Sequence, residues 1–228
     1  MAQTTVFAER AVERERSTAD MTAAQVAYLR LKEMITTLAL APGTTVQEAE
    51  LQQQLGIGRT PLREALHRLS HEHMLHIYPR RAVVVAKLGF KEIAQIFELR
   101  LTLEATAASL AAQRLTQDEI TTLRTLGMDL QASRAQLDIV HFLRCDHAFH
   151  RTIAQYACND YLTEYVDHVL TLNLWLWHTY FATHRVRGAD LLPHEDIIAA
   201  LAQGDAATAE ALMREHVLQS KGQLLTQL

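Results

Sequence analysis

A helix-turn-helix pattern constrains the fold of this chain more than any other feature. Residues 46–69 read VQEAELQQQLGIGRTPLREALHRL, in which two helical stretches, 47–55 and 59–73, meet at the tight turn Gly56–Gly58. The second stretch begins with cations and a hydroxyl and places leucine and alanine along its other face. A helix of this kind can enter the major groove of DNA with its first residues.

The sequence around this pattern completes a small domain. A helix is expected over residues 22–39, with Pro42-Gly43 ending it. Two β-rich runs lie on either side of the basic turn Pro79–Ala82 and predict a hairpin. Three helices and a hairpin make a winged helix-turn-helix domain, expected over residues 22–88. The preceding residues 1–21 mix Glu and Arg without an apolar stretch, so they are expected to form a flexible arm rather than a signal peptide.

Residues 89–228 carry almost no strand signal and predict an all-α domain. Thr116 and Glu119 have the spacing of a capping box, and turn residues mark other helix ends. The expected fold class is mainly α, with an N-terminal winged helix-turn-helix followed by a C-terminal bundle of six helices. The expected helices of the bundle lie near 90–114, 118–133, 138–157, 160–182, 190–203 and 206–226.

The charge of the chain is divided unevenly between these two parts. The net charge is −4, but residues 22–90 hold eight Lys/Arg and five Asp/Glu, whereas residues 91–228 hold eleven Lys/Arg and seventeen Asp/Glu. A mildly basic N-terminal part and an acidic C-terminal part suggest two different functions. No apolar run approaches the roughly 20 residues that span a bilayer. Cys145 and Cys158 lack CxxC spacing and a secretory context, so a cytoplasmic protein without membrane association is expected.

The start of the third helix and the hairpin tip carry the candidate DNA contacts. Arg59 and Arg63 lie four residues apart on one face, where arginine can pair with guanine or hold phosphates. Thr60 can bond a phosphate at the helix N-terminus. Arg80 and Arg81 at the hairpin tip are placed to reach the minor groove or the backbone. A solvated helix with incidental arginines is the alternative, but the basic hairpin favours double-stranded operator DNA as a partner.

Four residues of the helical part are spaced as ligands of one cation. Asp146 and His150 lie at i and i+4 on one helix face, and His194 and His216 lie ten residues before and twelve residues after Gly204. On antiparallel helices these spacings are about 15 and 18 Å from the turn, so both imidazoles can reach one spot. One carboxylate and three imidazoles suit a divalent metal ion, zinc first, with nickel or manganese as alternatives. Chance spacing among twelve histidines is the competing explanation.

Several short motifs have a clear likeness to those of a known family. They are Glu50-Leu51, Leu55-Gly56-Ile57, Arg59-Thr60-Pro61-Leu62-Arg63-Glu64-Ala65-Leu66, Leu69 and Pro79-Arg80-Arg81. With them the chain resembles the GntR family of bacterial transcription regulators, in its FadR subgroup with an FCD ligand-binding domain of the six-helix, VanR-like type. The resemblance runs over roughly residues 22–226. It implies that Arg59, Thr60 and Arg63 contact operator DNA and that the wing enters the minor groove.

Three residues depart from the family pattern in the DNA-binding part. Gly58 stands where the family often has a Ser or Thr cap, which weakens the helix start. Ala49 stands where some members have a DNA-contacting Arg, and Ala82 replaces the usual glycine of the wing. These departures leave the operator sequence open but not the DNA-binding role.

The resemblance also implies roles in the helical domain. The family's Asp-x3-His pair and two later histidines fall here on Asp146, His150, His194 and His216. This match favours a metal site over chance spacing. Arg100 resembles an Arg that faces the effector pocket and can clamp a carboxylate, although an ion pair with Glu104 at i+4 explains it equally well. Asn173 is a further candidate for contact with the effector, a buried, hydrogen-bonded Asn being the alternative.

The expected function is a ligand-responsive transcription regulator. Two copies would pair as a homodimer and read the half-sites of a palindrome. A small organic acid bound at the metal would release a repressor from its operator, with activation as the less common mode. A metal-dependent enzyme and a regulator that senses the metal itself are alternatives. No nucleophile or phosphate loop supports an enzyme, so catalysis is not expected.

Overall fold

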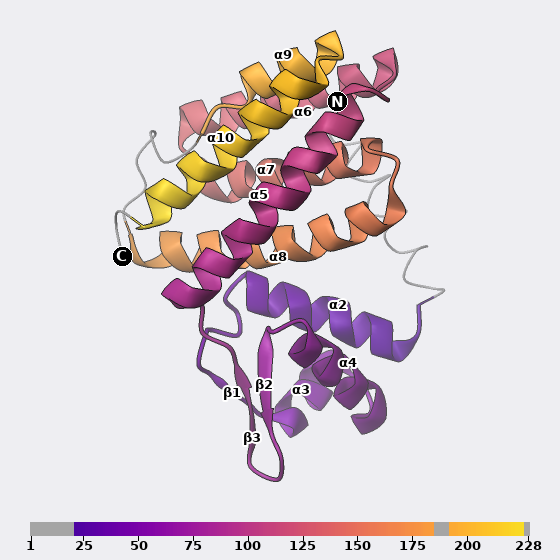
Figure 1. Cartoon of the computed structure of the whole chain (residues 1–228). Helices are drawn as coiled ribbons and strands as arrows, with labels where there is room; N and C mark the ends of the chain where they lie inside the picture. The colour runs from indigo at the N-terminus through magenta and orange to yellow at the C-terminus, as the bar shows by residue number, and fades with distance from the viewer. Residues whose placement is uncertain (1–20, 185–191, 226–228) are drawn as a thin grey trace, which may run out of the picture. The chain divides into compact units, whose positions relative to one another are not determined.

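The chain folds into two compact units with the boundary between Lys87 and Leu88 (Figure 1). The structure, a computed structural model, describes residues 21–184 and 192–225. The expected arm lies outside the described residues except for its last one. The predicted fold class, mainly α with a winged helix-turn-helix followed by an all-α part, is confirmed.

The first unit contains three helices and a three-stranded antiparallel sheet. Its elements are α2 (Ala23–Thr36), β1 (Thr45–Val46), α3 (Glu48–Leu55), α4 (Arg59–His71), β2 (Leu75–Tyr78) and β3 (Ala82–Val85). The strand order is β1-β3-β2, and the hairpin register pairs Leu75 with Val85 and Tyr78 with Ala82. The sequence pattern does not predict β1, because two residues give no periodic signal. Its Val46 is buried and pairs with Val83, so β1 is the third strand of the sheet and lies beside β3.

The helices of the first unit pack through faces that follow the helical period. A capping box at Thr22 starts α2, and the helix ends at Thr36, three residues earlier than predicted, before Leu38 adopts a left-handed φ of 64°. The fully buried side chains of α2 and α4 make most of this core. They are Ala27, Leu31 and Ile35 of α2 and Leu62, Leu66 and Leu69 of α4.

The turn between α3 and α4 needs glycine at one position. Gly56 ends α3 with a φ of 65°, in the left-handed region, where other residues pay roughly 1–2 kcal/mol. Gly58 precedes α4 in an extended conformation and provides no side-chain cap, as its departure from the family pattern predicts. The two glycines therefore act differently, one through backbone freedom and the other through a missing cap.

The second unit is a bundle whose six described helices enclose one apolar core. These helices are α5 (Phe90–Ala112), α6 (Gln117–Gln136), α7 (Ile139–Tyr156), α8 (Asp160–Thr183), α9 (Glu195–Gln203) and α10 (Ala206–Leu225). The long helix α5 packs against α10, α8 and α7, and α6 packs against α7 and α9 (Figure 1). The predicted capping box of Thr116 and Glu119 begins α6, with a 2.8 Å bond from the Thr116 backbone N–H to the Glu119 carboxylate.

Most helix bounds in the bundle lie within two residues of the sequence prediction, and two differ by more. The helix expected from residue 190 begins at Glu195, because His194 has a non-helical backbone and occupies the N-cap position. Residues 185–191 lie outside the described part of the chain. The helix expected to end at 133 continues to Gln136 and stops at Leu137, which has a left-handed φ of 54°. Among the described helices, none has the length and apolar character needed to cross a membrane.

Candidate functional site

The first turn of α4 presents the predicted DNA contacts to solvent. Arg59, Thr60 and Arg63 are all exposed. The face of α4 turned to the core consists of Leu62, Ala65, Leu66 and Leu69. This division places the positive end of the helix dipole and two guanidinium groups on one surface, which favours phosphate and base-edge contacts.

A hollow of about 500 Å³ lies between α4 and the hairpin of β2 and β3. Arg63, Arg80 and Arg81 line it. The hairpin turns tightly because Arg80 has a left-handed φ of 58° and the backbone N–H of Arg81 donates to the Tyr78 carbonyl at 3.0 Å. Arginines around one concave surface suit a nucleic-acid backbone.

Glu48 is an acidic residue of this surface that the sequence pattern does not indicate. The Arg63 Nε donates to the Glu48 Oε2 at 3.0 Å, and Glu48 also lines the hollow. Glu48 begins α3 and lies 15 residues before Arg63, so no local spacing indicates the pair. The pair brings a negative charge next to the arginines on the candidate DNA-binding surface.

The four predicted metal ligands come together in the second unit. Asp146 and His150 lie one turn apart on α7, His216 lies on α10, and His194 immediately precedes α9. One ligand atom from each lies within 4.8 Å of those of the others. The Asp146 Oδ1 is 3.0 Å from the His194 Nε2 and 3.7 Å from the His150 Nε2. Segments that are distant in sequence thus place a carboxylate and three imidazoles around one point.

The burial and the hydrogen bonding of the imidazole nitrogens indicate whether this cluster suits a cation. His150, His194 and His216 are only 2, 3 and 7% exposed. His150 Nδ1 lies 2.6 Å from Glu104 Oε2 and His194 Nε2 lies 3.0 Å from Asp146 Oδ1, but within the described residues neither contact has full hydrogen-bond geometry, and His150 Nε2 and His194 Nδ1 have no such partner either. Each unpartnered buried polar atom costs roughly 1–3 kcal/mol. A divalent ion would satisfy the Nε2 atoms that face Asp146, so the donor set fits such an ion.

Electrostatics keep Asp146, His194 and His216 in the protonation states that bind a cation, but not His150. Burial would raise the pKa of Asp146, but His150 and His194 hold it well below its ordinary value, so the carboxylate is ionised. Burial lowers the pKa of His194 and of His216, which leaves both rings neutral with a lone pair to offer. Burial also acts to lower the pKa of His150, but Glu104 and Asp146 outweigh it and raise that pKa to about 9. His150 is therefore protonated in the metal-free protein and must release its Nε2 proton to bind an ion.

Arg100 takes part in a buried network next to the cluster. Its Nε donates to the Glu104 Oε1 at 2.5 Å, and its Nη1 donates to the Asn173 Oδ1 at 2.8 Å. Burial would raise the pKa of Glu104, but Arg100 and His150 lower it to about 2. Arg100 therefore forms the ion pair considered in the sequence analysis. Asn173, on α8, is a buried hydrogen-bond acceptor for Arg100.

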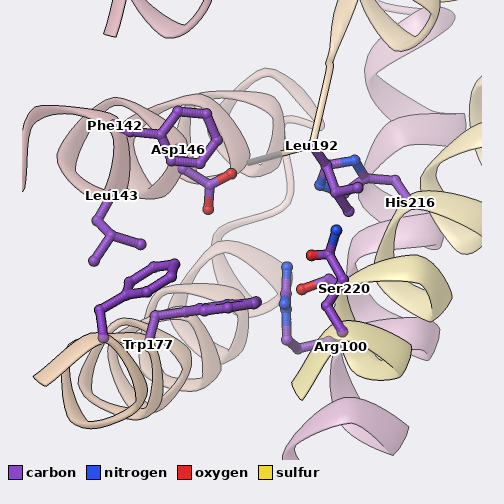
Figure 2. A pocket seen from close by; sticks show the side chains of 10 residues that line it. Arg100, Phe142, Leu143, Asp146, Trp177, Leu192, His216 and Ser220 are labelled. Carbon is purple, nitrogen blue, oxygen red and sulfur yellow. The ribbon is translucent and has the colours of Figure 1, made fainter. Parts of the chain in front are cut away.

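A small cavity adjoins the cluster, with a volume of about 20 Å³ (Figure 2). This is room for about one water molecule. The polar lining comes from Arg100, Asp146, His216, Ser220 and Gln223. The apolar lining comes from Phe142, Leu143, Trp177, Phe181 and Leu192. Figure 2 shows Arg100, Ser220 and His216 gathered on one side and Leu143 and Trp177 on the other. Arg100 thus both pairs with Glu104 and lines the cavity, whereas Asn173 is not part of the lining.

Some lining residues were missed, although the sequence holds a signal for them. Ser220 and Gln223 follow His216 by four and seven residues, so they lie on the same face of α10. No such spacing joins Glu104 to His150, whose Nδ1 lies 2.6 Å from the Glu104 Oε2. That contact depends on how α5 packs against α7.

Comparisons with known proteins place both units in characterised families. The family model described as bacterial regulatory proteins, gntR family, matches residues 23–85, and the model described as FCD domain matches residues 95–219. Together they account for most of both units.

Individual relatives agree with these matches. The chain is 27% identical over 202 residues to an HTH-type transcriptional regulator in an unstable DNA locus of Streptomyces ambofaciens, covering 83% of this chain and 80% of the relative. It is 28% identical over 204 residues to the HTH-type transcriptional repressor RspR of Escherichia coli, covering 85% of each. Among solved structures, Escherichia coli McbR/YncC superposes with a TM-score of 0.79 at 25% identity, covering 91% of this chain and 99% of that one.

Proposed function

The chain belongs to the GntR family of bacterial regulatory proteins and carries an FCD domain, and from this premise we propose that it is a repressor released by a small carboxylate bound at a metal ion. It is a transcriptional regulator rather than an enzyme, since its family and relatives regulate transcription. The observation that supports the proposal most is that the buried Arg100 lines the same cavity as Asp146 and His216 of the ligand cluster.

The first unit supplies the DNA-binding half of this function. A GntR helix-turn-helix domain implies DNA binding. Arg59, Thr60 and Arg63 would contact the major groove, and Arg80 and Arg81 of the wing would contact the adjacent backbone or minor groove. Two copies of the chain would form a homodimer that reads a palindromic operator in the cytoplasm.

The second unit supplies the effector-binding half. An FCD domain implies binding of a small molecule. The ion would be held by Asp146, His150, His194 and His216. When bound, the ion supplies a positive charge that attracts a carboxylate. Arg100, which lines the cavity, would donate to the same carboxylate through the N–H groups that its bonds to Glu104 and Asn173 leave free.

The chain connects these two halves through one short segment. Only residues 86–89 separate β3, the second strand of the wing, from α5, the helix that carries Arg100. An effector that draws Arg100 toward itself acts on the helix that begins where the DNA-binding unit ends. For repression to be relieved, the effector must bind more tightly to the arrangement with weak DNA affinity. The name of the relative RspR, a transcriptional repressor, supports this polarity.

His194→Ala tests the proposal by removing one ligand without touching the DNA-binding unit. We expect the wild-type protein to bind zinc and to lose affinity for a promoter fragment from its own locus when the right small carboxylate is added. The variant should bind the fragment but show neither stoichiometric zinc nor the response. His71→Ala, which removes an exposed histidine of α4, is the control for histidine content. Full zinc occupancy in His194→Ala would overturn the ligand assignment.

The small cavity also favours a second candidate function. A volume of about 20 Å³ admits an ion or a water more readily than an organic acid. In that case the metal itself would be the signal. Zinc added alone to the metal-free protein would then change DNA affinity, whereas in the first candidate only zinc together with a carboxylate does so.

A further inference from the structure

One buried carboxylate connects the ligand cluster with the arginine of the cavity. Glu104 is 2% exposed. Its Oε1 accepts from the Arg100 Nε at 2.5 Å, and its Oε2 lies 2.6 Å from the His150 Nδ1. A carboxylate removed from water needs such partners on both oxygens. Oε1 of Glu104 is therefore committed to Arg100, whereas Oε2 lies against His150 and also accepts a longer bond, 3.5 Å, from the Arg100 Nη2.

The contact with Glu104 determines which nitrogen of His150 faces the cluster. Because Nδ1 lies against Glu104, Nε2 is the nitrogen directed to Asp146, at 3.7 Å from its Oδ1. An imidazole that binds a cation through Nε2 carries its proton on Nδ1. A carboxylate placed at Nδ1 selects this tautomer and fixes the orientation of the ring.

The other end of the network fixes Arg100. Glu104 holds its Nε, and Asn173 accepts from its Nη1 at 2.8 Å. Its Nη2 also donates to the Glu104 Oε2 at 3.5 Å, so all three nitrogens are held and the guanidinium has one orientation in the lining of the cavity. An i,i+4 ion pair that only stabilised α5 would need neither His150 nor Asn173 as further partners.

We propose that Glu104 is a positioning residue that orients His150 toward the metal ion and Arg100 toward the cavity at the same time. The inference rests on the proposed function, because it assumes that the cluster holds an ion. It extends that function by joining the ion and the effector arginine through a single side chain.

Zinc affinity of Glu104→Gln tests the proposal. The amide keeps the shape of the side chain but not its charge or its two acceptor oxygens. We expect the affinity for zinc, measured by competition with a chromophoric chelator, to fall about 10–100-fold. Glu98→Gln removes an exposed carboxylate from the same helix and should leave the affinity unchanged. Equal zinc affinity in Glu104→Gln and in the wild-type protein would overturn the inference.

A spectroscopic signature separates positioning from a merely structural role. In the zinc-loaded wild-type protein with ¹⁵N-labelled histidine, one histidine should show an Nδ1–H proton shifted strongly downfield by a carboxylate partner. That proton signal should move upfield in Glu104→Gln and stay in place in Glu98→Gln. An unmoved signal would contradict the proposal.

The experiment separates failure of folding from failure of metal binding. If Glu104→Gln does not fold because Arg100 is left as an uncompensated buried charge, Arg100→Gln combined with Glu104→Gln removes both charges and serves for the same measurements. A wild-type protein that binds no zinc would overturn the proposed metal site and this inference with it. Zinc binding by the wild-type protein that is equal in the variants would overturn the inference alone.

Discussion

At the first turn of α4, Arg63 is already engaged by Glu48, with 3.0 Å between Nε and Oε2. Arg63 keeps 51% of its side chain exposed, so the pair contributes no more than about 1 kcal/mol. A phosphate or a guanine must nevertheless compete with Glu48 for this guanidinium. Glu48 also brings a negative charge to the surface that the DNA backbone would approach. The operator affinity is therefore expected to depend on Glu48 as well as on Arg63.

Substitutions at these two residues should change DNA affinity in opposite directions. Arg63→Ala should weaken operator binding by about 1–3 kcal/mol through loss of a DNA contact. Glu48→Gln should strengthen it a few-fold at low salt, because a competitor and a repulsive charge are removed. Fluorescence anisotropy with a labelled operator at fixed salt measures both. Glu50→Gln, an exposed carboxylate of the same helix α3, is the matched control. Unchanged affinity in Arg63→Ala would contradict the assignment.

Tyr28 of α2 gives the first unit a pH dependence at the alkaline end. Burial raises its pKa above the ordinary value of 10.0, while its hydroxyl donates to Glu72 at 2.7 Å and accepts from Lys32 at 2.8 Å. The folded state thus favours the neutral phenol more than the unfolded state does. This contribution to stability is complete below about pH 10 and is lost as the pH rises through the folded pKa. Urea unfolding from pH 8 to 11 should show less loss of stability in Tyr28→Phe than in the wild-type protein. Tyr161→Phe, at an exposed site, should follow the wild-type curve.

At the scale of elements, the helices were predictable where their ends carry local signals. The capping box at Thr116 and the glycine turn at Gly56 fix helix ends through residues that are neighbours in sequence. The strand β1 was not predictable, because its two residues become a strand only by pairing with β3. The start of α9 was misplaced for a related reason. His194 leaves the helical conformation where tertiary contacts bring its ring to Asp146, and helix propensity alone does not encode this.

The uncapped start of α4 is a local weakness that one substitution should remove. Gly58 has φ −67° and ψ 165°, suitable for a capping side chain, and an added Cβ would meet only Pro61 at 3.8 Å. Gly58→Ser should therefore be more stable than Gly58→Ala by about 1 kcal/mol, because only serine can accept from the first backbone N–H groups of α4. The free energy of urea unfolding of the two variants measures the difference. Equal stability would show that the helix start needs no side-chain acceptor.

At the scale of the whole molecule, the candidate site depends on packing that spacing only partly reveals. Asp146 and His150 were visible as an i,i+4 pair, and the distances of His194 and His216 from Gly204 indicated equal heights. Arg100 was ambiguous, since its partners Glu104 and Asn173 are 4 and 73 residues away. The cavity combines side chains of α5, α7, α8 and α10 with Leu192. Its volume and the division of its lining follow from how these helices pack, which no periodicity determines.

Removal of the metal should destabilise the second unit. The cluster joins α7, the residue before α9, and α10, so an ion bound there stabilises the folded bundle by mass action. At a free zinc concentration 100 times the Kd this amounts to about 2.7 kcal/mol, or a rise in Tm of roughly 5–10 °C. Calorimetry with zinc and with a chelator measures the shift. His216→Ala should abolish it, and His71→Ala should retain it. An identical Tm under both conditions in the wild-type protein would contradict a metal held by these residues.

The tightness of the cavity beside Arg100 has a thermodynamic consequence for the proposed effector. With room for about one water molecule, the cavity admits an organic acid only if side chains that line it, such as Trp177, Phe181 or Leu192, are displaced. Part of the attraction is spent on that displacement, and the measured affinity will be weaker than the contacts alone suggest. The same displacement couples effector concentration to DNA affinity only if the displaced side chains favour the arrangement that binds DNA weakly.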